Sequence, residues 1–216
     1  MNLEAIVEAA ITDMDETNKA REAALSTSRS LVRQCANAIR ATHRQEWEVA
    51  QALLGEADQT ANELRSRLQQ HAAILHAGYT QDALKEYAEA RLTYAMVRGE
   101  TLPTATAIDV LPAAYLNGLA EAASELRRYI LDGLRKGDVA TGERLLGAMD
   151  DVYSLLVTVD YPDAVTGGLR RTTDALRAVL ERTRGDLTAA LRQEQLMAAL
   201  AQVEQRLPND NRADRA

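Results

Sequence analysis

The chain has 216 residues, of which 46% are hydrophobic but only 4% aromatic, with no phenylalanine and a formal net charge of −7. A core built from alanine and leucine favours helices over sheets, and the acidic balance excludes a protein that coats nucleic acid with a uniformly basic surface. The single cysteine, Cys35, excludes an internal disulfide and points to a reducing compartment, and we expect it to be a small core residue.

The N-terminal segment, MNLEAIVEAAITDMDE, has neither the basic stretch nor the apolar stretch of a secretory signal. No run in the sequence approaches the roughly 18 consecutive apolar residues that a membrane-spanning helix needs. We therefore expect a cytoplasmic protein with no membrane partner.

Helical periodicity continues along almost the whole chain. We predict helices at residues 3–44, 46–75, 80–98, 111–136, 139–159 and 163–206, with the first and last either continuous or bent or split. Turn signals such as HAGYTQD, KGD and DYPDA separate them. Thr80 or Asp82 is expected to cap the third helix, and Pro112 suits the first turn of the fourth. The sequence thus predicts a single all-α domain over residues 1–206, a helical bundle, followed by a polar, disordered tail at residues 207–216.

The segment from residue 23 to residue 45 contains no Asp or Glu, although the protein is acidic. It carries His43 and four arginines that we call the arginine stripe: Arg29, Arg33, Arg40 and Arg44. Their spacing places the four arginines on one narrow side of a helix. A row of arginines can pair with the phosphates of a nucleic acid. The stripe therefore predicts nucleic-acid contact, and the alternative is a solvated face or salt bridges to a neighbouring acidic helix.

Four glutamates form two pairs at helical spacing, and we call them the carboxylate cluster: Glu86, Glu89, Glu121 and Glu125. Like charges four residues apart destabilise a helix unless a cation lies between them, and Arg128 or a metal ion could be that cation. By spacing alone, the four side chains are more typical of a solvated surface. If they meet, oxygen ligands without a nearby histidine suit Mg²⁺ or Mn²⁺, which activate water and hold phosphoryl oxygens during hydrolysis.

Other chemistry finds little support in the sequence. It has no Walker loop, Rossmann fingerprint, zinc-ligand spacing or nucleophile motif. A ferritin-like di-iron centre needs Glu-x-x-His motifs, and His43, His71 and His76 do not follow glutamate at that spacing.

Several segments, in order, resemble the translin superfamily. DALKEYAEA and TYAMVRGETL are followed by AAYLNGLAEAASELRRYILDGLRKGD, which has the superfamily form Tyr-Leu-x-Gly, then Ser/Gly-Glu-Leu, then Gly-Asp. The matching residues are Tyr115, Leu116, Gly118, Ser124, Glu125, Leu126, Gly137 and Asp138. LSTSRSLVRQCANAIRATHR is similar to the arginine-bearing first helix of the superfamily, and AVTGGLRRTTDALRAVLERTRGDL is similar to its last shared segment. The resemblance covers roughly residues 20–190.

Within the superfamily, the chain resembles trax-type members more than translin-type members. Trax-type members carry an EYxEA segment and metal-binding carboxylates that cleave RNA, whereas translin-type members lack most of these acids. Glu86, Glu89 and Glu125 match the trax pattern. Glu121 stands where trax commonly has aspartate, a departure that keeps the charge and lengthens the side chain by one methylene.

The resemblance implies an all-α fold of about seven helices that assembles into a hollow homo-oligomer, usually an octamer, with the carboxylates facing the interior. It also implies a metal-dependent endoribonuclease that cleaves single-stranded or short RNA with a metal-activated water. The carboxylate cluster would hold Mg²⁺ or Mn²⁺, while the arginine stripe and His43 would guide the strand. The alternatives are a translin-like assembly that binds RNA or single-stranded DNA without cleaving it and, more distantly, a helical scaffold with no nucleic-acid role.

Overall fold

The computed structural model describes residues 2–206, so residue 1 and the predicted polar tail at 207–216 lie outside the described part of the chain. Within residues 2–206 the chain forms eight helices and no strand, which confirms the predicted all-α class. The helices are α1 (Leu3–His43), α2 (Trp47–Leu68), α3 (Ala72–Leu75), α4 (Gly78–Arg98), α5 (Pro112–Leu134), α6 (Val139–Leu156), α7 (Asp163–Thr166) and α8 (Leu169–Arg206).

Two predicted helices are each divided in the structure. The predicted helix at 46–75 is wrong as a single element, because the chain turns between α2 and α3 and this turn brings Ile74 into the core. The predicted helix at 163–206 is interrupted by Gly167 and Gly168, whose φ angles of 61° and 83° are left-handed. Glycine adopts such angles without the steric cost that other residues incur. The glycine pair therefore separates α7 from α8.

The start of α4 also differs from the prediction. Neither predicted capping residue fills that role, because α4 begins at Gly78 with Ala77 at the capping position and no side-chain cap. The Thr80 hydroxyl instead donates to the backbone carbonyl of Ile74 at 2.8 Å. Pro112 does lie in the first turn of α5, as predicted.

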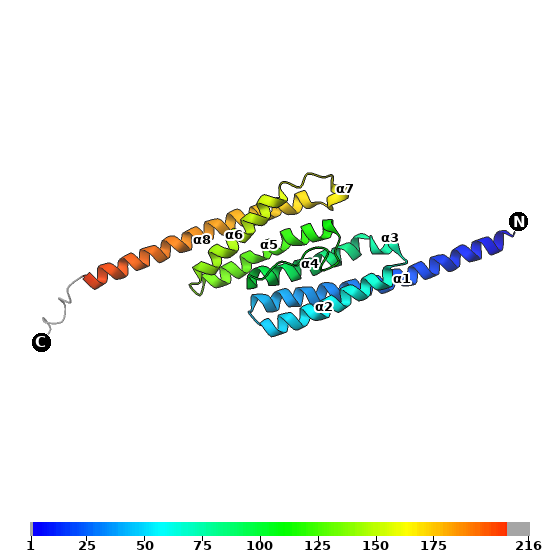
Figure 1. Cartoon of the computed structure of the whole chain (residues 1–216), viewed down its shortest axis with the longest axis horizontal. Coiled ribbons are helices and arrows are strands. Elements are labelled where there is room, and N and C mark those ends of the chain that lie inside the picture. The colour runs from blue at the N-terminus through cyan, green and yellow to red at the C-terminus, as the bar shows by residue number, and fades with distance from the viewer. Residues whose placement is uncertain (1, 207–216) are drawn as a thin grey trace.

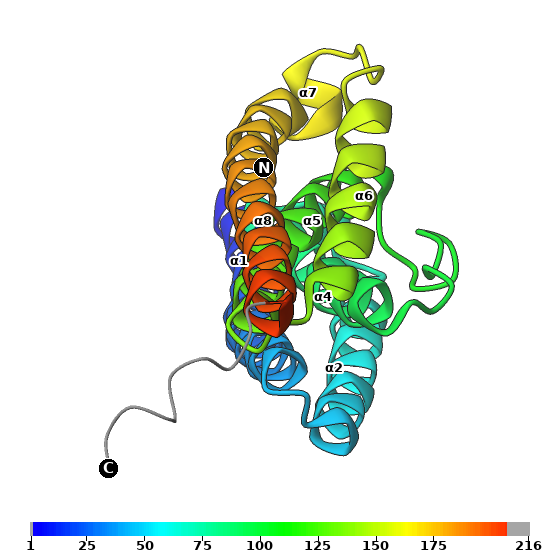
Figure 2. The ribbon, with the colours of Figure 1, turned by 90° about the vertical axis from the view of Figure 1, so that its left-hand side faces the viewer.

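The helices lie in three tiers (Figures 1 and 2). Helices α1 and α2 form one outer tier, α4 and α5 the central tier, and α6 and α8 the other outer tier. One core cluster joins α1, α2 and α4, and a second joins α5 to α6 and α8. The central tier is therefore covered on both sides, which explains why 13 of the residues of α4 are buried.

The segment that carries the superfamily motif fixes the ends of the central helix α5, through Asn117 at the variable motif position and through Gly137 and Asp138. At its start, the Asn117 amide donates to the backbone carbonyl of Thr166 at 2.8 Å and accepts from the Thr172 hydroxyl at 2.7 Å, which ties α5 to α7 and α8. After its end, Gly137 has a φ of 80°, and the Asp138 carboxylate accepts from the Thr141 backbone N–H to cap α6. The motif thus sets both the position of α5 and the turn that follows it.

The two longest helices extend beyond the three tiers at opposite ends of the molecule (Figure 1). All described residues from 2 to 19 are exposed, as are residues 192–205. Both extensions carry exposed apolar side chains, namely Leu3, Ile6, Val7, Ile11 and Met14 on α1 and Leu196, Met197, Leu200 and Val203 on α8. None of the helices within residues 2–206 is both long and apolar enough to span a membrane.

The only tryptophan of the sequence, Trp47, lies where the two core clusters meet. Its ring packs edge-on against Tyr94, with 6.3 Å between ring centroids. The Arg98 guanidinium carbon lies 5.0 Å from the centroid of the indole ring, an arrangement that allows a cation–π interaction. Trp47 therefore links the α1–α2 tier to the end of α4.

Candidate carboxylate metal site

The candidate site lies between α4 and α5, and one glycine allows these helices to approach each other closely. A Cβ atom at Gly118 would lie 2.8 Å from the Lys85 carbonyl oxygen and 3.1 Å from the Glu89 backbone nitrogen. Both distances are shorter than ordinary carbon contacts allow, so only glycine fits here without displacing a helix. The Gly118 position of the superfamily motif thus places the backbone of α5 directly against the segment of α4 that carries the glutamates.

Three members of the carboxylate cluster meet across this contact. One carboxylate oxygen from each of Glu86, Glu89 and Glu121 lies within 4.8 Å of the others. Glu89 is only 8% exposed, and the other two are half-buried. The solvated-surface interpretation suggested by spacing alone is therefore wrong. Sequence reasoning missed the burial because α4 is packed on both sides and has no single apolar stripe.

The fourth member, Glu125, is held by a histidine from α1. The His43 Nε2 atom lies 2.8 Å from Glu125 Oε2, and the imidazole is almost completely buried. This hydrogen bond, together with the charge of Arg128, lowers the pKa of Glu125 below its usual value. Our grouping of His43 with the strand-guiding arginines needs correction, since its side chain faces the carboxylate cluster and not the solvent. The cluster therefore has a nearby histidine, which spacing along the sequence did not reveal.

A lysine that we did not single out from the sequence reaches into the cluster. The Lys85 ammonium lies 2.5 Å from Glu121 Oε2 and 3.3 Å from Glu86 Oε1. Lys85 precedes Glu89 by four residues on α4, and this spacing places both on one side of a helix. The spacing was a usable signal, but the partner Glu121 comes from α5 and only the tertiary fold brings it close.

The most buried carboxylate, Glu89, has a strongly shifted pKa. Burial, together with the negative charges of Glu86, Glu121 and Glu125, raises the pKa of Glu89 to about 8, although the Lys85 ammonium opposes this shift. At neutral pH a proton therefore remains on Glu89 even with Lys85 in the cluster, and a divalent cation bound beside it would favour loss of that proton. Like charges packed at this distance are unfavourable without a cation among them.

The donor set fits a small divalent cation. It consists of hard carboxylate oxygens from two helices that are held at fixed separation by close backbone packing. Mg²⁺ and Mn²⁺ prefer such ligands. Glu86, Glu89 and Glu121 could hold such an ion, and the His43-bound Glu125 lies on the same helix as Glu121.

Helix α1 has one side that is exposed to solvent and carries arginines, in addition to the buried side that borders the carboxylate cluster. All four members of the arginine stripe are exposed. Arg44 forms two hydrogen bonds with Glu46, at 2.9 and 2.7 Å, and Arg40 donates to Asn37. On the opposite face Cys35 is completely buried, as expected, and burial together with Glu86 and Glu89 raises the pKa of its thiol. The same helix therefore borders the carboxylate cluster on one side and presents arginines to solvent on the other.

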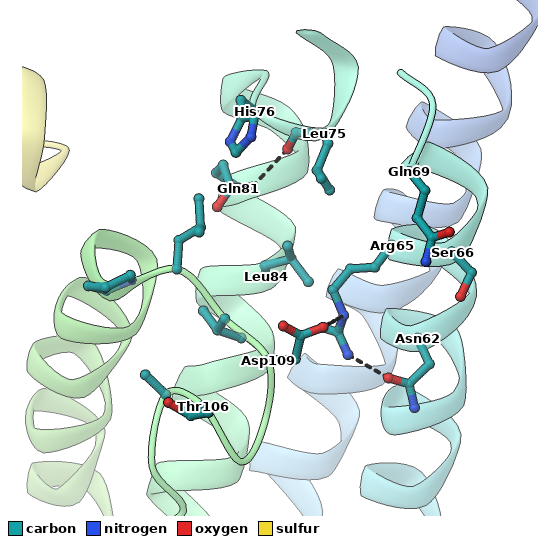
Figure 3. Close-up of a pocket in the computed structure, with 14 residues that line it drawn as sticks. Asn62, Arg65, Ser66, Gln69, Leu75, His76, Gln81, Leu84, Thr106 and Asp109 are labelled. Atoms are coloured by element: carbon teal, nitrogen blue, oxygen red, sulfur yellow. Dashed lines mark hydrogen bonds and ion pairs between the residues drawn. The ribbon is translucent and has the colours of Figure 1, made fainter. Parts of the chain in front are cut away.

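A separate cavity of about 460 Å³ lies between α2, the start of α4 and the loop that leads into α5 (Figure 3). There, Arg65 Nε lies 3.0 Å from Asp109 Oδ2, and the same guanidinium donates to Asn62. These contacts fasten the loop to α2. No member of the carboxylate cluster lines this cavity, so it is distinct from the candidate metal site.

Comparison with known proteins identifies relatives over most of the chain. No family model matches the sequence. An uncharacterized protein of Methanocaldococcus jannaschii is 29% identical over 189 residues, which is 85% of this chain and 82% of that protein.

Solved structures give a closer view of the relationship. The structure of AfC3PO in complex with duplex RNA is 31% identical with a TM-score of 0.77, and it covers 87% of this chain and 97% of its own. A crystal structure of AfC3PO is 30% identical with a TM-score of 0.80 at the same coverage. Apo-NeC3PO, at 17% identity and a TM-score of 0.77 over 85% of this chain and 96% of its own, shares the fold. Because a C3PO chain matches almost end to end in both sequence and fold, this chain belongs to the translin superfamily, which includes the C3PO proteins.

Proposed function

We propose that the protein is a trax-like, metal-dependent endoribonuclease that cleaves single-stranded or short RNA. The observation that carries the proposal is the meeting of Glu86, Glu89 and Glu121 within 4.8 Å at a buried helix contact. A translin-type binder has no need for acids that repel both one another and the phosphates of its ligand. The cluster has a chemical purpose if a divalent cation holds it together.

The chain's own residues would perform defined tasks. Glu86, Glu89 and Glu121 hold and orient the cation, and His43 keeps Glu125 ionised beside them. Mg²⁺ or Mn²⁺ would supply the positive charge that lowers the pKa of a bound water and stabilises the charge that develops on the phosphodiester. Despite the extra methylene of Glu121 relative to aspartate, its carboxylate lies within 4.8 Å of those of Glu86 and Glu89, which supports its proposed role as a ligand.

RNA as the partner has two supports. AfC3PO, which matches this chain closely, was solved in complex with duplex RNA. The arginine stripe offers exposed guanidinium groups for phosphate contacts that do not depend on base sequence. A duplex must therefore be tested beside single-stranded RNA and DNA.

We also propose that several copies assemble into a closed homo-oligomer, with an octamer as the expected size. The apolar side chains on the extensions of α1 and α8 are exposed in the isolated chain and repeat at helical spacing. Apolar stripes of this kind mark contact surfaces. In a closed assembly these stripes would be covered, and the carboxylate cluster could then face an enclosed cavity. Light scattering coupled to size exclusion tests this: a monomer at micromolar concentration contradicts it.

One observation favours the second candidate, a translin-like protein that binds RNA or single-stranded DNA without cleaving it. The Lys85 ammonium already neutralises two of the carboxylates. If the lysine remained there permanently, the cluster would be a structural ion-pair network with no metal.

One experiment separates the two candidates. The purified protein is incubated with labelled single-stranded RNA, duplex RNA and single-stranded DNA, each with Mg²⁺, Mn²⁺ or a chelator, and binding is measured in parallel. The endoribonuclease predicts internal cleavage of RNA that requires the metal and stops with the chelator. Binding without cleavage under every metal condition supports the translin-like binder instead.

A further inference from the structure

Lys85 occupies an unusual position for a lysine. It lies on the same helix as Glu86 and Glu89, yet its ammonium crosses to Glu121 on α5. Its side chain is 20% exposed, less than the 32% and 33% of its two acidic partners. Burial lowers the pKa of Lys85, but the hydrogen bond and charge of Glu121 outweigh that effect and raise the pKa overall. The lysine is therefore charged and directed into the carboxylate cluster.

Two of the carboxylates that bind Lys85 are carboxylates that a metal would need. Glu121 and Glu86 each contact the ammonium, and both belong to the three carboxylates that lie within 4.8 Å of one another. A divalent cation bound by these groups would stand beside the ammonium with its like charge, in an environment where screening by water is weak. The same carboxylates therefore cannot hold both cations without repulsion between them.

We infer that Lys85 is an internal counter-ion of the carboxylate cluster, which a divalent cation must displace in order to bind; this rests on the proposed metal site. The lysine keeps the acids of α4 and α5 together when no metal is bound. It also competes with the metal, so that it lowers the metal affinity of the site. Its four-carbon stem allows the ammonium to swing away from the cluster, which a shorter or planar cation could not do as readily.

The competition predicts a direct effect on metal affinity, measured without RNA. In Lys85→Met the stem is replaced by an uncharged chain of similar length, and the dissociation constant for Mn²⁺, measured by isothermal titration calorimetry, should fall at least tenfold. Lys85→Arg keeps the positive charge and should not bind Mn²⁺ more tightly than the parent. Lys136→Met is the matched control, because Lys136 is exposed beyond the end of α5. It removes the same charge far from the cluster and should leave the affinity unchanged.

Displacement also predicts a change at the lysine itself. Acetylation of the folded protein with an amine-reactive reagent, followed by peptide mass spectrometry, reports how free each ammonium is. Acetylation of Lys85 should be slow in chelator and several-fold faster with saturating Mn²⁺, whereas Lys136 should react equally in both. Circular dichroism of each variant confirms that it is folded before these values are compared.

The outcomes separate this inference from the proposed nuclease. If parent and Lys85→Met bind Mn²⁺ equally, or the variant binds more weakly, the inference is overturned and the nuclease proposal stands. If only Lys85→Met binds Mn²⁺, the inference stands and the parent is not a metal-dependent nuclease. If neither binds Mn²⁺, both fail. Faster acetylation of Lys85 with Mn²⁺ supports displacement, and an unchanged rate contradicts it.

Discussion

Helix α1 carries the arginine stripe and also borders the carboxylate cluster, but the two regions are built in opposite ways. Each acid of the cluster is at least half-buried and faces another charged group from a different part of the fold. The arginines are exposed, and the partners seen for Arg40 and Arg44 come from within three residues along the chain. In the proposed function, the cluster would depend on geometry that the core enforces, whereas phosphate contact by the stripe would depend on charge and need little geometry. Substitutions in the two regions should therefore differ in size and in kind.

The largest effect should follow from removing a charge from the cluster. Glu86→Gln and Glu121→Gln nearly preserve shape but weaken the affinity for a cation, so RNA cleavage should fall at least about 100-fold, as for removal of one essential electrostatic group in other enzymes. RNA binding should persist or tighten, because fewer acids face the phosphates. Single-turnover cleavage and equilibrium binding measure the two effects. Glu143→Gln, an exposed control on α6, should change neither.

The burial of Glu89 predicts a dependence of stability on pH when a chelator is present. The pKa of Glu89 in the folded protein, about 8, is higher than the usual value of 4.5 for a glutamate side chain. The folded state therefore retains a proton that the unfolded state releases, and stability decreases as pH rises from about 4.5 to 8. Between pH 5 and 8 the loss should be about 3 kcal/mol, since each pKa unit is worth about 1.4 kcal/mol.

The variant Glu89→Gln isolates this effect from other titrating groups. From pH 5 to pH 8, the free energy of unfolding of the parent should decrease by about 3 kcal/mol more than that of this variant. Denaturant unfolding at several pH values measures both. If the stabilities of the parent and of Glu89→Gln changed with pH in parallel, Glu89 would be ionised in the folded protein. Added Mn²⁺ should reduce the difference, because a cation stabilises the ionised carboxylate.

A change at the helix contact should loosen the cluster without altering its charge. In Gly118→Ala the new Cβ must push α5 away from the Lys85 carbonyl, and such overpacking costs about 2 kcal/mol. Affinity for Mn²⁺ should fall in the same variant. The matched control is Gly147→Ala on α6, where nothing lies within 4 Å of the added Cβ. It should stabilise the protein by about 0.5–1 kcal/mol, because alanine favours helix over glycine.

The smallest effects should come from the arginine stripe. Arg29→Ala or Arg33→Ala should weaken RNA binding a few-fold for all RNA sequences alike. The slope of the logarithm of the binding constant against the logarithm of the salt concentration should become shallower by somewhat less than one. Binding is measured over a range of salt concentrations, with Arg135→Ala, an exposed residue after α5, as the control. Loss of affinity with an unchanged salt slope would indicate damage to folding and not a lost phosphate contact.

The sequence predicted the fold better than it predicted the site. Periodicity located the long helices, because alanine and leucine repeat at core spacing, but it could not locate the break between α2 and α3, where neither glycine nor proline interrupts the pattern. Helical spacing singled out the four glutamates, and the family resemblance implied that they act together as metal ligands. Their burial and the contributions of Lys85 and His43 depend on contacts between residues 36 and 82 positions apart, which no local pattern reports.

The placement of Trp47 gives this protein an internal optical reporter. Because the indole ring touches both core clusters and lies under the Arg98 guanidinium, its fluorescence should respond when the outer tiers separate, even if each helix stays intact. No other tryptophan contributes to the signal. Comparison of the fluorescence transition with the circular dichroism transition would therefore reveal whether the α1–α2 tier and the α6–α8 tier unfold together or one after the other.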